Sequence, residues 1–434
     1  LAQLINVLYS VVDRVYIGHL QGVSANALTG IGLALPIITI ITAFANLFGM
    51  GGAPLCSIAR GSHEEEKAEK VMGNSFSMLL FTGVLLMGIC FIFRKPLLYL
   101  FGASSATFPY ANAYISIYLC GTVFVMISLG MNQFINSQGF GKIGMLTVML
   151  GAFTNIVLDP ILIFGLDMGV QGAALATVIS QGVSGVACLV YMVKKFEILR
   201  IHREEWKVDG HMMMVLCGMG VPMGLQYSIT AIGSVILQTA ANTLGSAAVA
   251  AMTAGGKIGN FLACPFDAMG STMATYGGQN VGAGKLDRLG KGLKSCVLLG
   301  AGYSVIAFLI AVFFGGPLAQ LFVDGGEAEI IANVCAFLLW NTAFYIPLAL
   351  VNIVRFLIQG MGFPKFAILA GVFEMIARSL AGFGLVPIIG FTGVCLGSPI
   401  AWIMADAFLI PAYFHVSKVL QKRMVPQTDV PQAV

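Results

Sequence analysis

The chain has 434 residues, of which 58% are hydrophobic and only 10% are charged. Globular domains in water carry roughly 25% charged residues, so too few charges are present here to cover a water-facing surface. The net charge of +4 comes from basic loops rather than from a nucleic-acid-binding face. Composition therefore excludes a soluble domain and predicts a polytopic membrane protein.

Apolar stretches of about 20 residues, the length that spans a bilayer, recur along the whole chain. Breaks at Gly, Pro and charged clusters predict an all-α polytopic membrane protein with twelve transmembrane helices. The chain begins at Leu1 inside an apolar segment, so we expect residues to precede it. The predicted helices cover residues 1–18, 27–58, 70–93, 108–137, 142–164, 169–194, 212–241, 247–276, 290–315, 328–357, 365–387 and 391–416.

Basic residues are concentrated in the loops that follow even-numbered helices. Cytoplasmic loops carry an excess of Lys and Arg, so this asymmetry predicts that both termini lie in the cytoplasm. The stretch KKFEILRIHREEWKVDGH is the longest polar segment and divides the helices into two sets of six. The predicted domains are an N-terminal six-helix bundle, a cytoplasmic linker, a C-terminal six-helix bundle and a cytoplasmic tail, covering residues 1–194, 195–211, 212–416 and 417–434.

The two halves repeat each other at an offset of about 221 residues. There are three pairs of repeated segments. The first pair follows the second and eighth helices, the second pair follows the fourth and tenth helices, and the third pair opens the sixth and twelfth helices. They are GSHEEEKA (61–68) with GAGKLDRL (282–289), SQGFGK (137–142) with IQGMGFPK (358–365), and GVQGAAL (169–175) with GFTGVCL (390–396). Two pseudo-symmetric six-helix bundles in parallel orientation are a known transporter architecture.

Polar side chains in the first half fall on predicted membrane helices. Asp13 lies in LYSVVDRVYIG, with Asn6 seven residues earlier on roughly the same face. Asn155 and Asp159 are spaced i, i+4 in NIVLDPILIFG, so both side chains point the same way. Thr177 lies near the start of the sixth helix. Ionisable residues inside a membrane are costly, and each is a functional-site hypothesis by default.

Each of these residues also has a structural interpretation. Asn155 and Asp159 could form a buried hydrogen bond without other function, and Arg14 could pair with Asp13. Thr177 could satisfy its hydroxyl on its own helix backbone, as Thr often does. Pro160 lacks a backbone N–H, so it should loosen the helix after Asp159 and free a carbonyl.

Four further ionisable residues lie in apolar segments of the second half: Asp267, Glu374, Arg378 and Asp406. Glu374 and Arg378 are spaced i, i+4 and are predicted to pair with each other. Asp267 has no partner at a recognisable spacing. Arg355 lies toward a cytoplasmic helix end, where a long side chain can extend to the membrane surface.

These motifs resemble the multidrug and toxic compound extrusion (MATE) family, in the bacterial branch of DNA-damage-inducible and staphylococcal efflux proteins. The resemblance covers the whole chain, and its most specific parts are LYSVVDRVYIG and NIVLDPILIFG. It implies a cation- or proton-binding site in the N-terminal bundle formed by Asp13, Asn155, Asp159 and Thr177. Asn6 joins this set, although the branch often has the longer Gln there. Other branches use the C-terminal bundle, which retains Asp267, Glu374 and Arg378 as alternative sites.

The resemblance implies a secondary multidrug efflux antiporter of the bacterial cytoplasmic (inner) membrane. It would export amphiphilic, often cationic drugs or toxic metabolites in exchange for H⁺ or Na⁺, as its two bundles rock between inward-open and outward-open states. We expect no cofactor, no metal ion beyond Na⁺ at the cation site, no nucleic-acid partner, contact with membrane lipids and function as a monomer.

Other function classes fit the sequence less well. A flippase of the same superfamily for a lipid-linked saccharide would need cationic residues to meet phosphates, whereas the first-half interior is acidic. An enzyme would need a nucleophile with a base, or a metal cluster, at membrane depth. The sequence has no such group, and no G-x-x-x-x-G-K-[ST] segment for ATP.

Overall fold

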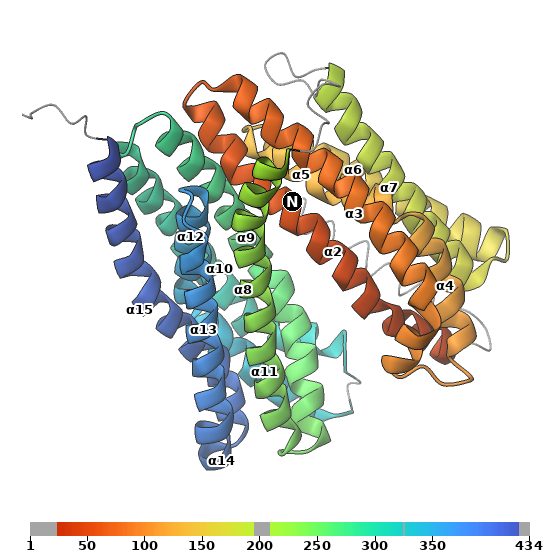
Figure 1. The fold of residues 1–434 in the computed structure, drawn as a ribbon. Helices are drawn as coiled ribbons and strands as arrows, with labels where there is room; N and C mark the ends of the chain where they lie inside the picture. Colours follow the sequence, from red (N-terminus) through yellow and green to blue (C-terminus); the bar gives the residue numbers. More distant parts are fainter. Residues whose placement is uncertain (1–23, 195–208, 324–325, 425–434) are drawn as a thin grey trace, which may run out of the picture. The chain divides into compact units, whose positions relative to one another are not determined.

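The computed structural model of the chain describes residues 24–194, 209–323 and 326–424 (Figure 1). Its regular elements within these ranges are all helices, which confirms the predicted all-α class. The predicted first helix, at 1–18, lies outside the described residues. Most of the predicted linker, and the last part of the tail, also lie outside them.

The chain forms two compact units. Unit 1 comprises Leu1–Cys56 and Glu64–Val221, and unit 2 comprises Ser57–His63 and Pro222–Val434. The boundary between Val221 and Pro222 falls inside a helix, so one continuous helix begins in unit 1 and continues into unit 2. The domain ranges predicted from the sequence, which divide the chain at its polar linker, stay a prediction.

Unit 1 is built around α7, which packs against four neighbouring elements: α4, α5, α6 and η1. A second set of contacts joins α3 to α4 and α5. Apolar residues dominate every one of these helices, so burial against other helices or lipid, rather than a polar surface, fixes their positions. The elements are α2 (Ser24–Gly61), α3 (Glu65–Leu100), α4 (Phe108–Cys120), α5 (Thr122–Ser137), α6 (Gly141–Pro160), η1 (Ile161–Gly165) and α7 (Gly169–Lys194).

Unit 2 continues from the helix that crosses the boundary. In it, α9 packs on α10, α11 and α12, while α15 packs on α11, α12 and α13. The elements are α8 (Gly210–Asn242), α9 (Ser246–Gly282), α10 (Asp287–Gln320), α11 (Ala328–Ala343), α12 (Tyr345–Gly360), α13 (Lys365–Leu380), η3 (Ala381–Leu385), α14 (Val386–Ile389) and α15 (Phe391–Met424).

The core of unit 2 contains a chain of aromatic contacts. The ring of Tyr345 on α12 meets Phe266 of α9 edge-on at 5.4 Å and Trp402 of α15 at 6.0 Å. The Tyr345 hydroxyl donates to the Gly259 carbonyl at 3.1 Å, so its polar atom is satisfied where the ring is buried. These contacts fix α9, α12 and α15 around one core.

Within the described residues, 8 helices are long and apolar enough to cross a membrane, or up to 10 if two bent pairs each count as one span. Both bent pairs differ from prediction, because 108–137 and 328–357 were expected to be continuous helices. The chain instead bends by 59° between α4 and α5, at Gly121, and by 52° between α11 and α12, at Phe344. The polytopic helical class is confirmed, with bends that the apolar pattern does not reveal.

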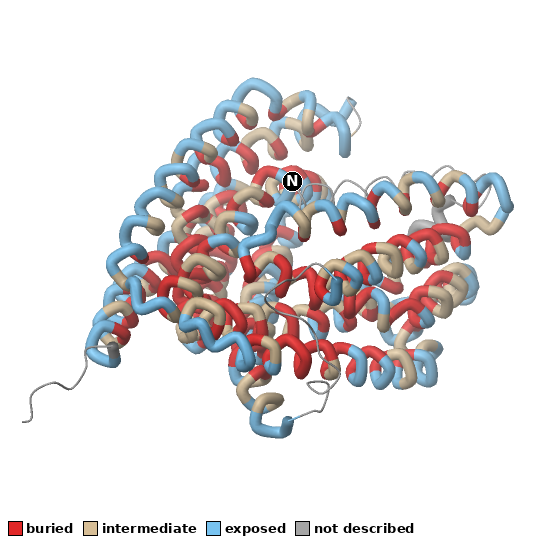
Figure 2. The backbone as a smooth tube through the Cα atoms, turned by 90° about the horizontal axis from the view of Figure 1, so that it is seen from above, coloured by how far each residue is buried: buried red, intermediate tan, exposed pale blue. Residues whose placement is uncertain are grey.

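The outward faces of the helices are apolar. Phe81, Ile92, Phe153, Leu298 and Phe313 are all more than half exposed. Figure 2 shows buried and exposed positions alternating along single helices, as expected when one face packs on protein and the other does not. An exposed apolar surface of this extent fits a lipid environment rather than water.

Two π-helical turns interrupt the helices in corresponding places of the two units. The first, η1, follows Pro160 at the end of α6, and the second, η3, follows α13. Pro160 supplies the cause of the first, because it cannot donate the usual intrahelical hydrogen bond. The turn is closed instead by the Leu166 N–H, which donates to the Ile161 carbonyl at 2.9 Å. The predicted loosening after Asp159 therefore takes the form of a π-turn.

Candidate functional site

Asn155 and Asp159 are buried together near the end of α6. Asp159 is 0% exposed and Asn155 is 1% exposed. The Asn155 Nδ2 amide donates to Asp159 Oδ1 at 3.4 Å, as the i, i+4 spacing predicts. The Asn155 Oδ1 atom has no hydrogen-bond partner among the described residues. A carboxylate and a buried amide oxygen therefore lie on one turn of helix.

Close contact between α6 and α7 holds this turn against small residues. A Cβ atom at Gly151 would lie 3.1 Å from the Ser180 carbonyl oxygen, and one at Gly172 would lie 2.7 Å from the Leu162 carbonyl oxygen. Gly151 precedes the Asn155–Asp159 turn on α6, and Leu162 follows this turn in η1. The antiparallel register therefore places the Asn155–Asp159 turn opposite residues 173–178 of α7.

Thr177 lies in that opposite stretch and is 9% exposed. Its hydroxyl donates to the Ala173 carbonyl of its own helix at 3.0 Å, which matches the structural interpretation. The hydroxyl oxygen keeps lone pairs and can still accept a hydrogen bond or bind a cation. Asn155, Asp159 and Thr177 thus come from two packed helices of unit 1.

The remaining members of the predicted site, Asp13 and Asn6, lie outside the described residues. The described part supplies oxygen atoms of three kinds: carboxylate, amide carbonyl and hydroxyl. Such a set binds a proton or a hard cation, because hard cations prefer oxygen ligands. The buried Asn155 Oδ1 atom, with no partner in the described part of the chain, fits a role as a ligand.

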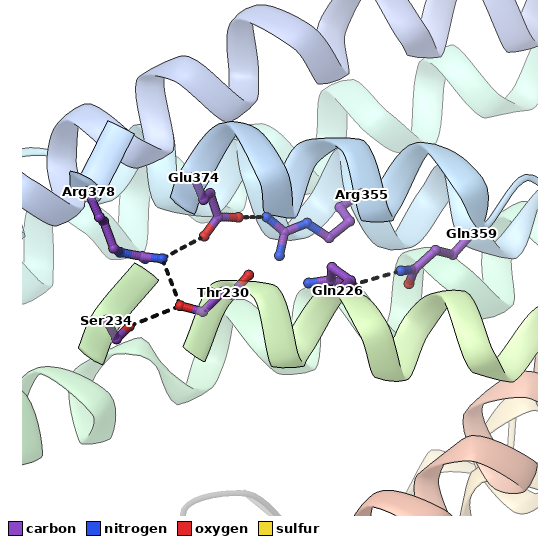
Figure 3. Close-up of polar contacts among 7 residues, drawn as sticks. All are labelled: Gln226, Thr230, Ser234, Arg355, Gln359, Glu374 and Arg378. Carbon is purple, nitrogen blue, oxygen red and sulfur yellow. Dashed lines mark hydrogen bonds and ion pairs between the residues drawn. The ribbon is translucent and has the colours of Figure 1, made fainter. Parts of the chain in front are cut away.

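A second buried polar cluster lies in unit 2 and centres on Glu374 of α13 (Figure 3). One carboxylate oxygen of Glu374 pairs with Arg355 of α12, and the other pairs with Arg378 at 3.4 Å. The Arg378 Nη1 atom also donates to the Thr230 carbonyl of α8 at 3.4 Å. The three charged side chains are 3–6% exposed. We call Arg355, Glu374 and Arg378 the charge triad.

The charge triad confirms one prediction and corrects another. Glu374 and Arg378 pair as their spacing predicts. Arg355 was predicted to extend to the membrane surface, but it is buried and pairs with Glu374. The reason is that α12 and α13 pack side by side, which offers the guanidinium a carboxylate closer than water.

A hydrogen-bonded pair of amide side chains also joins α8 to α12. Gln359 of α12 donates from Nε2 to Gln226 Oε1 of α8 at 3.3 Å, and both side chains are buried (Figure 3). The sequence does not identify Arg355 or these two glutamines as site residues. Their partners are 19 and 133 residues away along the chain, so no local spacing reveals them.

The other two acidic residues in the apolar segments of unit 2, Asp267 and Asp406, differ in burial. Asp267 on α9 is exposed, whereas Asp406 on α15 is 7% exposed. The alternative C-terminal residues Asp267, Glu374 and Arg378 are therefore not equivalent, because Glu374 and Arg378 are buried in the charge triad and Asp267 is exposed.

Buried carboxylates on membrane-spanning helices, in a chain of two helical units, define a polytopic membrane transporter. The family model described as MatE matches residues 1–161 and 222–383, one segment in each half of the chain. These segments cover well over half of the residues. The chain belongs to the MatE family, which confirms the resemblance and places it among transporters rather than enzymes.

Two relatives show how far the similarity extends. The multidrug export protein MepA of Staphylococcus haemolyticus is 30% identical over 250 residues, which are 58% of this chain and 55% of that protein. MepA of Staphylococcus aureus is 25% identical over 359 residues, which are 82% of this chain and 77% of that protein. The chain thus matches about half the length of the S. haemolyticus protein.

Solved structures share the fold. The Vibrio cholerae MATE transporter VcmN, in its bent form, is 21% identical with a TM-score of 0.88. The similarity covers 97% of this chain and 96% of that one. It shows that both units, and not one alone, follow the MATE fold.

Proposed function

We propose that this protein is a secondary multidrug efflux antiporter of the bacterial cytoplasmic membrane. The observation that carries the proposal is the buried Asn155–Asp159 turn, which faces α7 inside a chain of the MatE family. An aspartate that is 0% exposed on a membrane-spanning helix is expensive to keep. A cation or proton that binds and leaves during each transport cycle explains why it is retained.

The mechanism follows from the competition between two charge states of this turn. When Asp159 holds a proton or a cation, its buried charge is neutralised, and α6 and α7 can pack closely. When the cation leaves, the carboxylate regains its charge and favours a conformation in which water or a cationic drug reaches it. Cation and drug binding then oppose each other, and this coupling is reciprocal by necessity.

The named relatives support the substrate class, because both are multidrug export proteins. We propose amphiphilic, often cationic compounds as substrates, with H⁺ or Na⁺ as the coupling ion and both termini in the cytoplasm. Flipping of a lipid-linked saccharide is the alternative. It needs free cationic side chains to meet phosphate groups, whereas Arg355 and Arg378 are both engaged by Glu374.

Dye efflux in everted membrane vesicles tests this proposal. A pH gradient or a Na⁺ gradient, applied separately, should drive uphill dye transport, and an uncoupler or removal of Na⁺ should stop it. Uphill transport in a de-energised membrane supplied with ATP would contradict secondary transport. Movement of a lipid-linked saccharide without dye movement would favour the flippase.

A further inference from the structure

Two long helices each run from one unit of the chain into the other. The unit boundary follows Cys56 in α2 and Val221 in α8. A third crossing follows His63, in the turn between α2 and α3. A turn can adjust to a movement of one unit against the other, whereas a continuous helix has to bend. Any such movement therefore acts on α2 and α8 close to the boundary.

Both helices reach the boundary through a glycine-containing segment that ends in a proline. These segments are GMGGAP (49–54) in α2 and GMGVP (218–222) in α8. Pro54 and Pro222 lie inside their helices and lack the N–H that would close the preceding helical turn. Sharp bends in helices occur almost always at proline or at pairs of small residues. We call residues 49–54 and 218–222 the hinge segments.

The hinge segments touch each other through their backbones. A Cβ atom at Gly51 would lie 2.8 Å from the Gly220 Cα atom, and one at Gly220 would overlap the Leu47 carbonyl oxygen of α2. Both glycines are buried, and both lie in unit 1. Interlocked side chains resist small movements because a close-packed interface has few gaps to move into. With no side chain between the two backbones, α2 and α8 can change their crossing angle here without repacking.

Beyond its hinge segment, α2 is fixed to unit 2. A Cβ atom at Gly61 would overlap the Gln279 carbonyl oxygen of α9, and one at Gly282 would overlap the Ile58 carbonyl oxygen of α2. Gly61 and Gly282 are equivalent positions at the 221-residue offset of the repeat, and so are Ile58 and Gln279. The contact is therefore reciprocal, as at a two-fold interface. This close approach holds the end of α2 against α9.

The start of α8 is fixed to unit 1. The Asp209 N–H, directly before the helix, donates to Asn74 Oδ1 of α3 at 2.9 Å, and Asn74 is 3% exposed. Beyond the hinge segment, Gln226 of α8 accepts from Gln359 of unit 2. Each of the two crossing helices is thus held on one side by unit 1 and on the other by unit 2. Bending is concentrated in the hinge segments between these attachments.

We propose that the two hinge segments form a single pivot, at the Gly51–Gly220 contact, about which α2 and α8 bend when unit 2 moves against unit 1. The end of α2 then travels with α9, and the start of α8 stays with α3. Because the two hinge segments touch, one movement bends both helices together. This inference rests on the proposed transport cycle for the movement itself, and it adds the place where the movement is absorbed.

Distance measurements between the units test the pivot without measuring transport. Lys142 near the start of α6 and Lys365 at the start of α13 are both exposed and lie in different units. The double substitution K142C/K365C, in a chain whose 9 cysteines are replaced by alanine, takes a spin label at each position. Double electron–electron resonance in lipid nanodiscs then gives the distance distribution, with and without Na⁺, at about pH 5 and about pH 8, on either side of neutral pH.

We expect two distance populations in the labelled parent protein, one for each conformation. Gly51→Ala and Gly220→Ala place a methyl group at the same contact from opposite sides, so each should lower the same population by about tenfold. Gly224→Ala is the matched control, because its Cβ atom would meet nothing within 4 Å. The double substitution P54A/P222A restores both N–H groups without adding bulk, and should leave one population. This variant tests the pivot even where a methyl group at Gly51 or Gly220 prevents folding.

Three results would overturn the proposal. The first is a single distance population in the labelled parent under every condition, and dye efflux by that protein would leave the antiport standing. The second is a folded Gly220→Ala or P54A/P222A protein with the distribution of the parent. The third is an equal effect of Gly224→Ala and Gly220→Ala. A parent that responds to the hinge substitutions as expected but moves no dye would keep the pivot and refute the proposed antiport instead.

Discussion

Glu374→Gln should be the most destabilising polar substitution in unit 2. Glu374 lies nine residues after Lys365, which begins α13. At about 1.5 Å of rise per residue, this places it about 14 Å along the helix, close to half of a hydrocarbon core about 30 Å thick. The substitution removes the carboxylate with which two buried guanidinium groups, Arg355 and Arg378, both pair. Breaking a buried pair in this way costs about 3–5 kcal/mol.

The triple substitution R355M/E374L/R378M tests whether the loss of stability in Glu374→Gln comes from the two arginines left unpaired. Replacing a whole buried ion network with apolar side chains of similar volume is often neutral or stabilising, by up to about 4 kcal/mol. The triple variant should therefore be far more stable than Glu374→Gln. The free energy of unfolding, from SDS titration in mixed micelles followed by circular dichroism, measures both.

Glu66→Gln is the matched control. Its carboxylate pairs with Lys70 at 2.7 Å, but both side chains are exposed. An exposed pair contributes little, so this variant should unfold like the parent. A Glu374→Gln protein as stable as the parent would refute the view that the carboxylate neutralises both arginines. A triple variant less stable than Glu374→Gln would refute it as well.

Two further predictions concern unit 1 and the topology. Gly172→Ala should separate α7 from η1 at a cost of about 1–3 kcal/mol, and should impair efflux. Gly182→Ala, whose Cβ atom would meet Phe124 at an ordinary 3.9 Å, should not. Equal efflux by both variants would contradict the inference that α7 must approach η1 closely at Gly172. A membrane-impermeant thiol reagent should label single cysteines introduced in 195–211 and 417–434 from the cytoplasmic side, and labelling from outside would reverse the orientation.

Local spacing explains what the sequence could predict. Apolar runs of spanning length predict the helices, and the i, i+4 spacing predicts that Asn155 contacts Asp159 and that Glu374 contacts Arg378. These contacts lie within one helix, so the helical repeat is enough to identify them.

Contacts between helices could not be predicted in this way. Arg355 finds Glu374 only because α12 and α13 pack together, and Gln226 finds Gln359 across 133 residues. Irregular turns of the backbone are equally hard to predict from the sequence. Pro160 gives a local reason for η1, but η3 lacks a proline at the matching place, since Pro387 follows it. Packing, rather than a local signal, decides such features.

The role of Asp159 in coupling is the central claim, and gradient-driven dye efflux in everted vesicles that carry Asp159→Asn tests it most directly. The substitution keeps size and hydrogen bonding but removes the charge. We predict that Asp159→Asn and Asp13→Asn each abolish efflux driven by either gradient at normal protein levels. The double variant should be no worse than either single one, because groups that act as a unit are strongly non-additive. Normal efflux by Asp159→Asn and Asp13→Asn, together with loss of efflux in folded Asp267→Asn, would contradict the account and move the cation site to unit 2.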